Sequence, residues 1–487
     1  MKSSALLTDF YSLTMAQGYW KMGMNRRAVF EMYFRYHPFK SGFSVFAGLG
    51  SLLEKLKTLA FSQDEILYLK ELGIFEDAFL DYLKDFRFQG SVWAMEEGTV
   101  IFPVEPLIRV QGGLIECQLI EGLLLNTINF QSLVATKTAR IWLASGMGSV
   151  VEFGLRRAQG PDGAMSASRA AFIGGAMATS NTLAGKEFGI PIIGTMAHSW
   201  IMAFANEEKA FQVYADMYPD STVFLIDTYD TLKSGIVNAI KVGKTLAARG
   251  KNFGVRLDSG DIHYLSLEVR KKLNEAGLGE ATISVSNDLD ESIIQTLTNA
   301  KAPINTWGVG TKMVTGGEEA AFSGIYKLAA SENEKGEPTA KMKFSDNPEK
   351  TTNPGVKQVW RIKDPQGICV ADILALEDFN EPEASTDSEC LDSGKNYSFW
   401  HPQADYRRFT HTIDGSVKPL LVQWLDKGKP VREIKKLKDI QAHLCRELQS
   451  LDQTHKRILN PHIYKVSVTE KLRALKLDLI KNYLGDT

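Results

Sequence analysis

A run of short apolar segments that recurs through the middle of the chain constrains its fold more than any other feature. The segments are mostly β-branched, and helical patterns separate them with a repeat of ~30 residues, the length of a βα unit. Strands that are buried on both faces and alternate with helices indicate a parallel sheet. From residue 148 onward, the segments are GSVVEFG, PIIGT, TVFLIDT, NFGVRLDSGD, ATISVSND and INTWGVGT.

The number of these units bears on how the sheet is arranged. Six or more units without the glycine fingerprint of a dinucleotide-binding fold favour a closed barrel over an open sheet. We therefore expect an irregular α/β (TIM-like) barrel over residues 146–330. Residues 1–145 mix strand and helix patterns, which predicts an α+β N-terminal domain. Residues 331–487 predict C-terminal β and helical additions: flap-like loops, a hairpin around Asp364–Gly367, and charged helices.

Charge and composition exclude several classes of function. Lys and Arg number 56 against 58 Asp and Glu, and the net charge of -2 offers no field that would steer the chain toward nucleic acid or an anionic membrane. No stretch approaches ~18 consecutive apolar residues, and the first residues lack the apolar core of a signal peptide, so we expect a cytoplasmic protein. Scattered cysteines fit reduced thiols better than a zinc site or disulfides. They are Cys117, Cys369, Cys390 and Cys445.

In a barrel of this kind, functional side chains gather where each strand ends and its loop begins. The ends of the expected strands carry arginines, carboxylates, glycines, small polar residues, one aromatic ring and one histidine. In chain order they are Phe153, Arg156 and Arg157; Gly194, Thr195 and His198; Asp227, Thr228 and Asp230; Arg256, Asp258, Ser259, Gly260 and Asp261; Ser286, Asn287 and Asp288; and Gly308 to Gly317.

Most of these residues also have a structural interpretation. A lone histidine such as His198 is usually packed or solvated, and a G-x-G turn in isolation is only a turn. Asp261 is as well placed to cap the next helix as to bind a ligand. Arg156 and Arg157 fit surface charges equally well. Asp258 is not placed to cap a helix, and its carboxylate could form hydrogen bonds with sugar hydroxyls.

Taken together, the strand ends favour a functional interpretation. The GVGT turn ends a late strand of the expected barrel, where backbone N–H groups can approach a phosphate because glycine has no Cβ. Arginine forks suit phosphates and carboxylates. The combination of cations, at least two carboxylates, a glycine turn and an aromatic ring predicts a site for a polyanionic sugar phosphate and a flat ring.

Several longer motifs resemble one known family. LLTDFYSLTMAQGYW, EFGLRRAQGPDGAMSAS, GTMAHSW, VRLDSGD, SNDLDE and GVGT follow one another, with KTTNPGVKQVWR after them. In this order they resemble the nicotinate phosphoribosyltransferase family over most of the chain. The resemblance implies a type II phosphoribosyltransferase fold, which is an irregular α/β barrel with an N-terminal domain and C-terminal additions. The linear phosphoribosyl-diphosphate signature of type I enzymes is absent, which agrees with this assignment.

The resemblance implies an enzyme at the start of NAD salvage. Nicotinate and 5-phosphoribosyl diphosphate would give nicotinate mononucleotide and diphosphate, coupled to ATP hydrolysis through a phosphohistidine. His198, Asp258 and Arg256 would be catalytic, with His198 the residue that ATP phosphorylates. Tyr11 and Phe153 would sandwich the pyridine ring, and Thr195 and Arg256 would address nicotinate or the ribosyl-bound substrate. The other substrate-binding residues implied are Arg156, Asn287, Gly308, Gly310 and Thr311, several of them beside Asp258 in the phosphoribosyl pocket.

The resemblance also implies Mg²⁺, ATP as a co-substrate, and a homodimer. Asp227, Asp258 and Asp261, with Asp230 beside them, are the candidates for holding the metal, and their ranking is open. Tyr11 must reach the site from the N-terminal segment, which suggests a dimer with shared active sites. No nucleic acid or membrane partner is expected.

Four other activities stay open at this stage. A nicotinamide phosphoribosyltransferase is disfavoured by Met196, because the related amide enzymes have an aspartate there that would repel the carboxylate of nicotinate. A quinolinate enzyme would be shorter and richer in cations. An aldolase or isomerase acting on another sugar phosphate should show a Schiff-base lysine or an acid–base pair at the strand ends. An inactive sensor of the mononucleotide is disfavoured by the intact Arg156, His198, Arg256 and Asp258.

Overall fold

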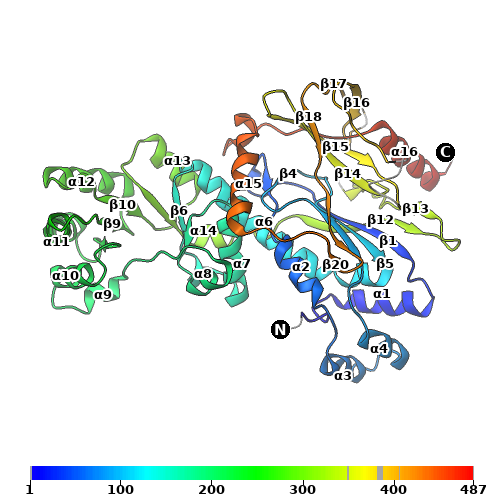
Figure 1. Ribbon diagram of the computed structural model, residues 1–487, viewed down its shortest axis with the longest axis horizontal. Helices are drawn as coiled ribbons and strands as arrows, with labels where there is room; N and C mark the ends of the chain where they lie inside the picture. Colours follow the sequence, from blue (N-terminus) through cyan, green and yellow to red (C-terminus); the bar gives the residue numbers. More distant parts are fainter. Residues whose placement is uncertain (1–2, 348–349, 381–387, 405, 486–487) are drawn as a thin grey trace. The chain divides into compact units, whose positions relative to one another are not determined.

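The computed structural model describes residues 3–347, 350–380, 388–404 and 406–485. The chain forms two compact units (Figure 1). The first unit combines Met1–Leu133 with Ala321–Thr487, and the second is Val134–Ala320. The terminal parts of the chain belong to one unit because strands from both share a sheet.

The second unit is built on a six-stranded parallel sheet in the order β7-β6-β11-β10-β9-β8. Five of its strands come from the predicted apolar segments, so the α/β class of this region is confirmed. The strands are β6 (Ser149–Glu152), β7 (Ala178–Thr179), β8 (Val223–Leu225), β9 (Gly254–Leu257), β10 (Thr282–Val285) and β11 (Thr306–Val309).

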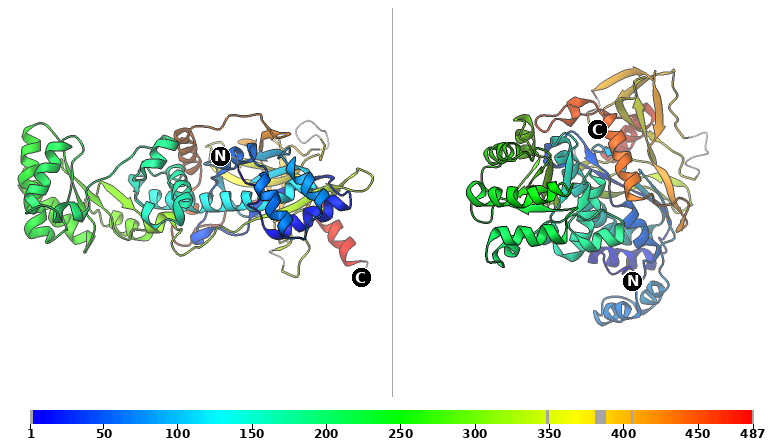
Figure 2. Two further views of the ribbon diagram at one scale, coloured as in Figure 1. Left: turned by 90° about the horizontal axis from the view of Figure 1, so that it is seen from below. Right: turned by 60° about the vertical axis from the view of Figure 1, so that its left-hand side comes forward.

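Helices connect these strands, and polar residues before several of them cap their first turns. Asp261 accepts a hydrogen bond from the backbone N–H of Tyr264 at 3.0 Å, and Asp290 caps its helix in the same way. Figures 1 and 2 show α10, α11 and α12 grouped outside β9 and β10. The helices are α7 (Gly160–Ile173), α8 (Thr182–Phe188), α9 (His198–Met202), α10 (Glu207–Met217), α11 (Ile236–Ala248), α12 (Ile262–Glu275), α13 (Glu291–Asn299) and α14 (Thr311–Val314).

The expected closed barrel is not confirmed. Among the described residues the outer strands β7 and β8 do not pair with each other, so the sheet is open. The segment PIIGT, which we expected to be a strand, makes only a single parallel bridge, between Thr179 and Ile192. Pro191 has no N–H to donate, and residues 191–194 are exposed, so this segment has neither the donors nor the buried face that extend a sheet.

The first unit contains a seven-stranded antiparallel sheet in the order β13-β12-β1-β5-β3-β19-β20. Its central strands come from the N-terminal part of the chain, and its outer strands come from after residue 321. The strands are β1 (Arg27–Phe34), β3 (Ser91–Ala94), β5 (Ile108–Gly113), β12 (Gly324–Glu332), β13 (Pro338–Ala340), β19 (Val422–Asp426) and β20 (Lys429–Pro430). The small sheet of β2 (Ser44–Val45) and β4 (Val100–Ile101) lies in the same unit.

A second large sheet supplies the predicted C-terminal β structure, in the order β17-β16-β21-β15-β14-β18. The predicted hairpin is confirmed, since β14 and β15 pair antiparallel on either side of residues 364–368. The strands are β14 (Lys357–Lys363), β15 (Cys369–Leu376), β16 (Asn396–Trp400), β17 (Arg408–Thr412), β18 (Ser416–Pro419) and β21 (Val466–Val468).

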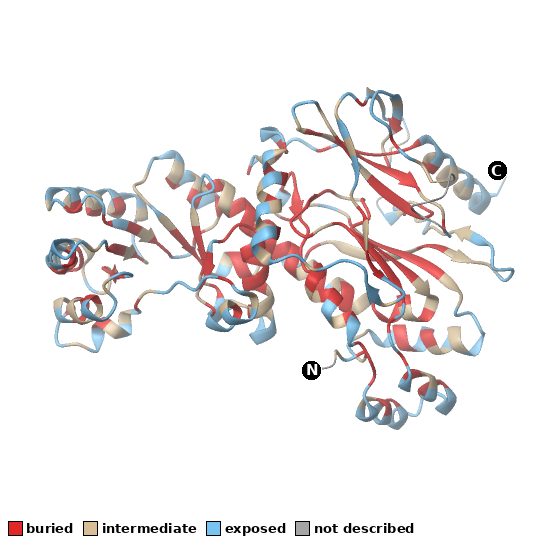
Figure 3. Ribbon diagram, viewed as in Figure 1, coloured by how far each residue is buried: buried red, intermediate tan, exposed pale blue. Residues whose placement is uncertain are grey.

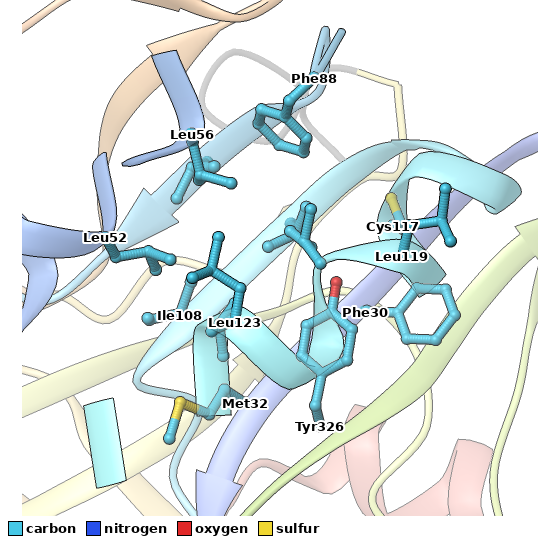
Figure 4. Close-up of a cluster of buried hydrophobic side chains, with 14 of the residues drawn as sticks. Phe30, Met32, Leu52, Leu56, Phe88, Ile108, Cys117, Leu119, Leu123 and Tyr326 are labelled. Carbon is cyan, nitrogen blue, oxygen red and sulfur yellow. The ribbon is translucent and has the colours of Figure 1, made fainter. Parts of the chain in front are cut away.

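The core of the first unit lies between one face of the seven-stranded sheet and its helices. Phe30 and Met32 of β1 pack with Ile108 of β5 against Leu119 and Leu123 (Figure 4). Because side chains alternate along a strand, Glu31 points to the opposite face, where it forms a buried ion pair with Lys357 at 2.8 Å. The helices are α1 (Phe10–Lys21), α2 (Leu49–Lys57), α3 (Gln63–Glu71), α4 (Asp77–Lys84), α5 (Leu114–Leu119), α15 (Leu437–Gln449) and α16 (Glu470–Leu484), with the part of α6 (Glu121–Ala144) that ends at Leu133.

Burial follows the same plan in both units. Figure 3 shows the central strands of the sheets buried and the outer faces of most helices exposed. The long apolar pattern that ends at Ala144 forms α5 and α6, with many buried positions. In the part of the chain that the structure describes, no helix is both long enough and apolar enough to cross a membrane.

Candidate active site

A cavity of about 480 Å³ opens in the second unit at the carboxyl ends of its parallel strands. Ligands bind at this edge in α/β proteins because the loops that follow neighbouring strands meet there. All six strands contribute to the cavity, either from their last residues or from the residues that follow. Its lining is Phe153, Leu155, Arg156, Arg157, Ser180, Gly194, Thr195, Met196, Ala197, His198, Leu225, Arg256, Asp258, Ser286, Asn287, Asp288, Gly308, Gly310 and Thr311.

The guanidinium of Arg256 is held in one orientation by three neighbours. It donates from Nη1 to Oγ1 of Thr195 at 3.0 Å, and from Nε to Oγ of Ser286 at 2.9 Å. A third donation, from Nη2, reaches Oδ1 of Asp258 at 2.9 Å. Because these partners follow different strands, the planar fork is fixed before any ligand binds.

Asp258 lies between Arg256 and His198. Burial raises the pKa of its carboxyl, but the hydrogen bond from Ser286 and the charge of Arg256 outweigh burial, so the pKa lies below its ordinary value. The carboxylate is therefore ionised at neutral pH, and it faces both the arginine and His198.

His198 is the first residue of α9, and both of its ring nitrogens have neighbours. Nδ1 lies 3.1 Å from Oγ1 of Thr228, and Nε2 lies 3.7 Å from Oδ2 of Asp258. The side chain is 41% exposed, so the ring is anchored on one side and open to the cavity on the other.

Asp227, which follows β8, supports the loop after β9. Its Oδ2 accepts from the backbone N–H of Asp258 at 2.8 Å and from Oγ of Ser259 at 2.6 Å. Its Oδ1 is buried and has no hydrogen-bond partner among the described residues. An unpaired buried carboxylate oxygen is costly, so it marks a position where a cation would fit.

Phe153 forms an aromatic wall of the cavity directly after β6. The guanidinium carbon of Arg256 lies 5.5 Å from the centre of the Phe153 ring. Gly308 is required beneath it, because a Cβ at that position would lie 2.6 Å from the ring. Gly310 is also close, since a Cβ there would lie 3.2 Å from the carbonyl oxygen of Phe153.

The remaining lining residues lie around the rim. Arg156 and Arg157 are exposed on the short turn of 3-10 helix that follows Phe153. Asn287 and Asp288 have positive φ angles of 98° and 23°, which residues other than glycine rarely adopt. Such strain is concentrated at functional sites.

Several residues singled out from the sequence lie elsewhere. Asp261 and Asp230 do not line the cavity, and both cap the first turns of helices. Tyr11 belongs to the first unit, where its hydroxyl donates to Glu121 at 3.1 Å. Its contact with the pyridine ring of the substrate stays a prediction. Among the described residues, no three His, Cys, Asp or Glu side chains gather as a metal site.

Sequence reasoning missed the buried Glu152 at the end of β6 and gave no role to Ser286. The only sequence signal for Glu152 was a carboxylate inside an otherwise apolar strand segment. Ser286 was visible in the SND motif, but its bonds to Arg256 and Asp258 depend on how the neighbouring strands pair.

Comparison with known sequences matches three parts of the chain to one family. Residues 6–129 match the nicotinate phosphoribosyltransferase (NAPRTase) N-terminal domain, residues 149–366 the nicotinate phosphoribosyltransferase (NAPRTase) family, and residues 356–476 the nicotinate phosphoribosyltransferase C-terminal domain. The chain is 42% identical to the nicotinate phosphoribosyltransferase of Bacillus subtilis (strain 168), with 98% of this chain and 95% of that protein covered. It is 37% identical to the one from Caenorhabditis elegans, with 96% and 92% covered.

The fold is also that of a solved relative. The crystal structure of human nicotinic acid phosphoribosyltransferase superimposes with a TM-score of 0.83 at 30% sequence identity, and covers 97% of this chain and 99% of that one.

Proposed function

Because the chain belongs to the nicotinate phosphoribosyltransferase family, we propose that the cavity at the ends of its parallel strands is the active site. The chain is an enzyme that forms nicotinate mononucleotide and diphosphate from nicotinate and 5-phosphoribosyl diphosphate, a step of NAD salvage. The single observation that carries the site assignment is the meeting of Arg256, Asp258, His198 and Phe153 in one cavity.

Nicotinate would bind in the part of the cavity beside Phe153 and Arg256. Phe153 offers an aromatic face to the pyridine ring, and the fixed guanidinium of Arg256 near that face suits a carboxylate. Thr195 lies beside the arginine, and Met196 is 5% exposed and carries no charge that would repel the acid. This pocket therefore favours nicotinate over nicotinamide.

The phosphoribosyl group would bind in the part of the cavity beside Asp258 and Gly310. Breaking the bond between C1 and diphosphate leaves positive charge on the ribose, which the ionised Asp258 stabilises. Gly308, Gly310 and Thr311 line this part of the cavity, and Arg156 adds positive charge at the rim. Asn287, on the same rim, is placed to form a hydrogen bond with the phosphoribosyl group. Holding both substrates in one cavity aligns the ring nitrogen with C1.

A magnesium ion fits beside the carboxylates. Mg²⁺ is usually held by one or two carboxylates together with substrate phosphates, so the lack of a three-carboxylate cluster among the described residues is compatible with it. Asp227, with its unpaired buried oxygen, and Asp258 would hold it. When bound, the ion would neutralise charge on the diphosphate leaving group.

ATP acts through His198 in this proposal. With Nδ1 against Thr228, Nε2 is the nitrogen that faces Asp258 and the cavity. The lone pair of Nε2 attacks the γ-phosphorus of ATP, the N–P bond forms, and the bond to the bridging oxygen breaks to release ADP. Water later cleaves the N–P bond and releases phosphate. The phosphohistidine adds about −1.5 to −2 charges beside Asp258 while it lasts, by analogy with other phosphorylated residues, and so changes how the cavity holds its ligands.

The assembly and location are part of the same proposal. We propose a homodimer in which Tyr11, at 48% exposure, completes a pyridine site with Phe153, and a cytoplasmic enzyme whose partners are nicotinate, 5-phosphoribosyl diphosphate and ATP.

The test is direct. The purified chain is incubated with nicotinate, 5-phosphoribosyl diphosphate and Mg²⁺, with and without ATP, and the mononucleotide is measured by chromatography. We expect product in the wild type, faster with ATP, and a loss of roughly 100-fold in kcat/KM for Arg256→Ala, about 2.7 kcal/mol. The control is Arg249→Ala, an exposed arginine that pairs with Asp216. Equal losses in the two variants, or no product in the wild type, would contradict the proposal.

A further inference from the structure

Glu152 is a buried carboxylate beside the cavity that the reaction itself does not use. It is the last residue of β6, and only 1% of it is exposed. Its Oε2 accepts from Oγ of Ser168 at 2.9 Å and from Oγ1 of Thr179 at 2.5 Å. Its Oε1 accepts from the backbone N–H of Gly154, two residues further along the chain. The carboxylate thus joins α7, β7 and the turn that follows its own strand.

The turn that Glu152 holds carries Phe153. This turn is fixed from two other sides as well: the N–H of Phe153 donates to the carbonyl of Val309 at 2.8 Å, and Gly154 packs so tightly on Val314 that a Cβ would overlap its side chain. The hydrogen bond from the N–H of Gly154 to Glu152 is the third contact that fixes the turn. These contacts set the direction in which the Phe153 ring leaves the strand.

The chemistry of the site explains why a carboxylate stands here. The backbone N–H of Gly154 needs an acceptor, which one oxygen of Glu152 supplies, and the hydroxyls of Ser168 and Thr179 lie within hydrogen-bond distance of the other oxygen. Burying such a group is costly unless it is fully bonded. A carboxylate buried at that cost, and bonded to the turn beside the aromatic wall, does more than fill space.

We propose that Glu152 is a positioning residue for the pyridine site: it acts through Phe153 by holding the turn after β6. This inference rests on the proposed function, because it needs nicotinate to lie against Phe153. Without the carboxylate, the N–H of Gly154 loses its acceptor and the ring is free to leave the orientation that faces Arg256. Nicotinate should then bind less well, while 5-phosphoribosyl diphosphate is less affected.

A double-mutant cycle tests the inference. We expect Glu152→Ala and Phe153→Ala each to raise the KM for nicotinate by roughly 10-fold, with changes below about 3-fold in the KM for 5-phosphoribosyl diphosphate. If Glu152 acts through the ring, the double variant should be no worse than Phe153→Ala alone. Losses that multiply in the double variant, or a Glu152→Ala enzyme with wild-type KM for nicotinate, would overturn the proposal.

Two further variants separate positioning from general stability. Glu152→Gln keeps a carbonyl oxygen for the N–H of Gly154, so its KM for nicotinate should stay within about 2-fold of wild type even if its melting temperature falls. Ser168→Ala removes one bond from Glu152 but leaves the one to Gly154, and it should behave like Glu152→Gln. If Glu152→Ala does not fold, Glu152→Asp takes its place in the cycle, because its shorter side chain withdraws from Gly154.

The kinetic outcomes distinguish this inference from the function on which it rests. A wild type that makes no mononucleotide contradicts the proposed function. An active wild type whose KM for nicotinate rises as much in Glu152→Gln and Ser168→Ala as in Glu152→Ala contradicts only the positioning role, because lost stability would then explain all three.

Discussion

Nε2 of His198 lies 3.7 Å from Oδ2 of Asp258, and the same carboxylate accepts a hydrogen bond from Arg256 at 2.9 Å. One anionic group therefore connects the residue proposed to react with ATP to the residue proposed to bind nicotinate. A phosphoryl group added to His198 would bring negative charge next to Asp258. In the proposed mechanism, this link is the route by which ATP alters substrate binding.

Gly308→Ala tests the aromatic wall. The added Cβ would lie 2.6 Å from the Phe153 ring, so the ring must move, and we expect the KM for nicotinate to rise roughly 10-fold. The control is Gly279→Ala, where a Cβ meets only an ordinary contact at 3.5 Å with Asn274. Steady-state kinetics on both variants decide the matter, and an unchanged KM in Gly308→Ala would show that nicotinate does not use this ring.

Met196→Asp tests the choice between acid and amide. A carboxylate at this buried position of the cavity would repel nicotinate and could accept from the N–H₂ of nicotinamide. We expect kcat/KM for nicotinate to fall by about 10-fold or more, equivalent to about 1.4 kcal/mol, and the preference to move toward nicotinamide. Met196→Leu should keep the wild-type preference. If Met196→Asp and Met196→Leu have the same preference, this residue does not set specificity.

Glu105→Gln tests a buried carboxyl of the first unit. Burial raises the pKa of Glu105 well above its ordinary value of 4.5, and the Asp372 carboxylate raises it further, against the opposing effect of Arg361. The unfolded chain therefore ionises first as the pH rises, and the free energy of unfolding should fall as the pH rises above the ordinary pKa of 4.5.

The glutamine variant cannot ionise but keeps an acceptor for the N–H of Phe102, which bonds Glu105 at 2.9 Å. We expect this part of the pH dependence to disappear in the variant, as followed by urea unfolding of both proteins. Parallel pH curves for the two proteins would show that Glu105 is already ionised in the native state.

The convergence of the site follows from the sequence because of one property of parallel sheets. Residues that follow neighbouring strands meet at one edge, so Phe153, Thr195, Asp258 and Gly308 could be placed in one group from their positions after apolar segments. The sequence allowed Asp261 either to cap the next helix or to bind a ligand, and local sequence alone could not choose between these two roles. In the structure it caps α12.

Other features depend on pairing that no local pattern encodes. PIIGT has the apolar character of a strand, yet Pro191 and the exposure of its neighbours limit it to one bridge, and the sheet stays open among the described residues. The role of Glu152 has no local sequence signature, because its partners Ser168 and Thr179 come from other elements. The sheet shared by the two terminal parts of the chain depends in the same way on long-range pairing of β1 with β12.

His198 is the group through which we propose that ATP acts. The decisive measurement is the rate of nicotinate mononucleotide formation, with and without ATP, in the wild type, in His198→Ala, and in His263→Ala, whose histidine is exposed on α12. We predict that ATP accelerates the wild type and His263→Ala, and that His198→Ala keeps a slow rate that ATP does not change. A His198→Ala enzyme accelerated by ATP as strongly as the wild type would contradict the account.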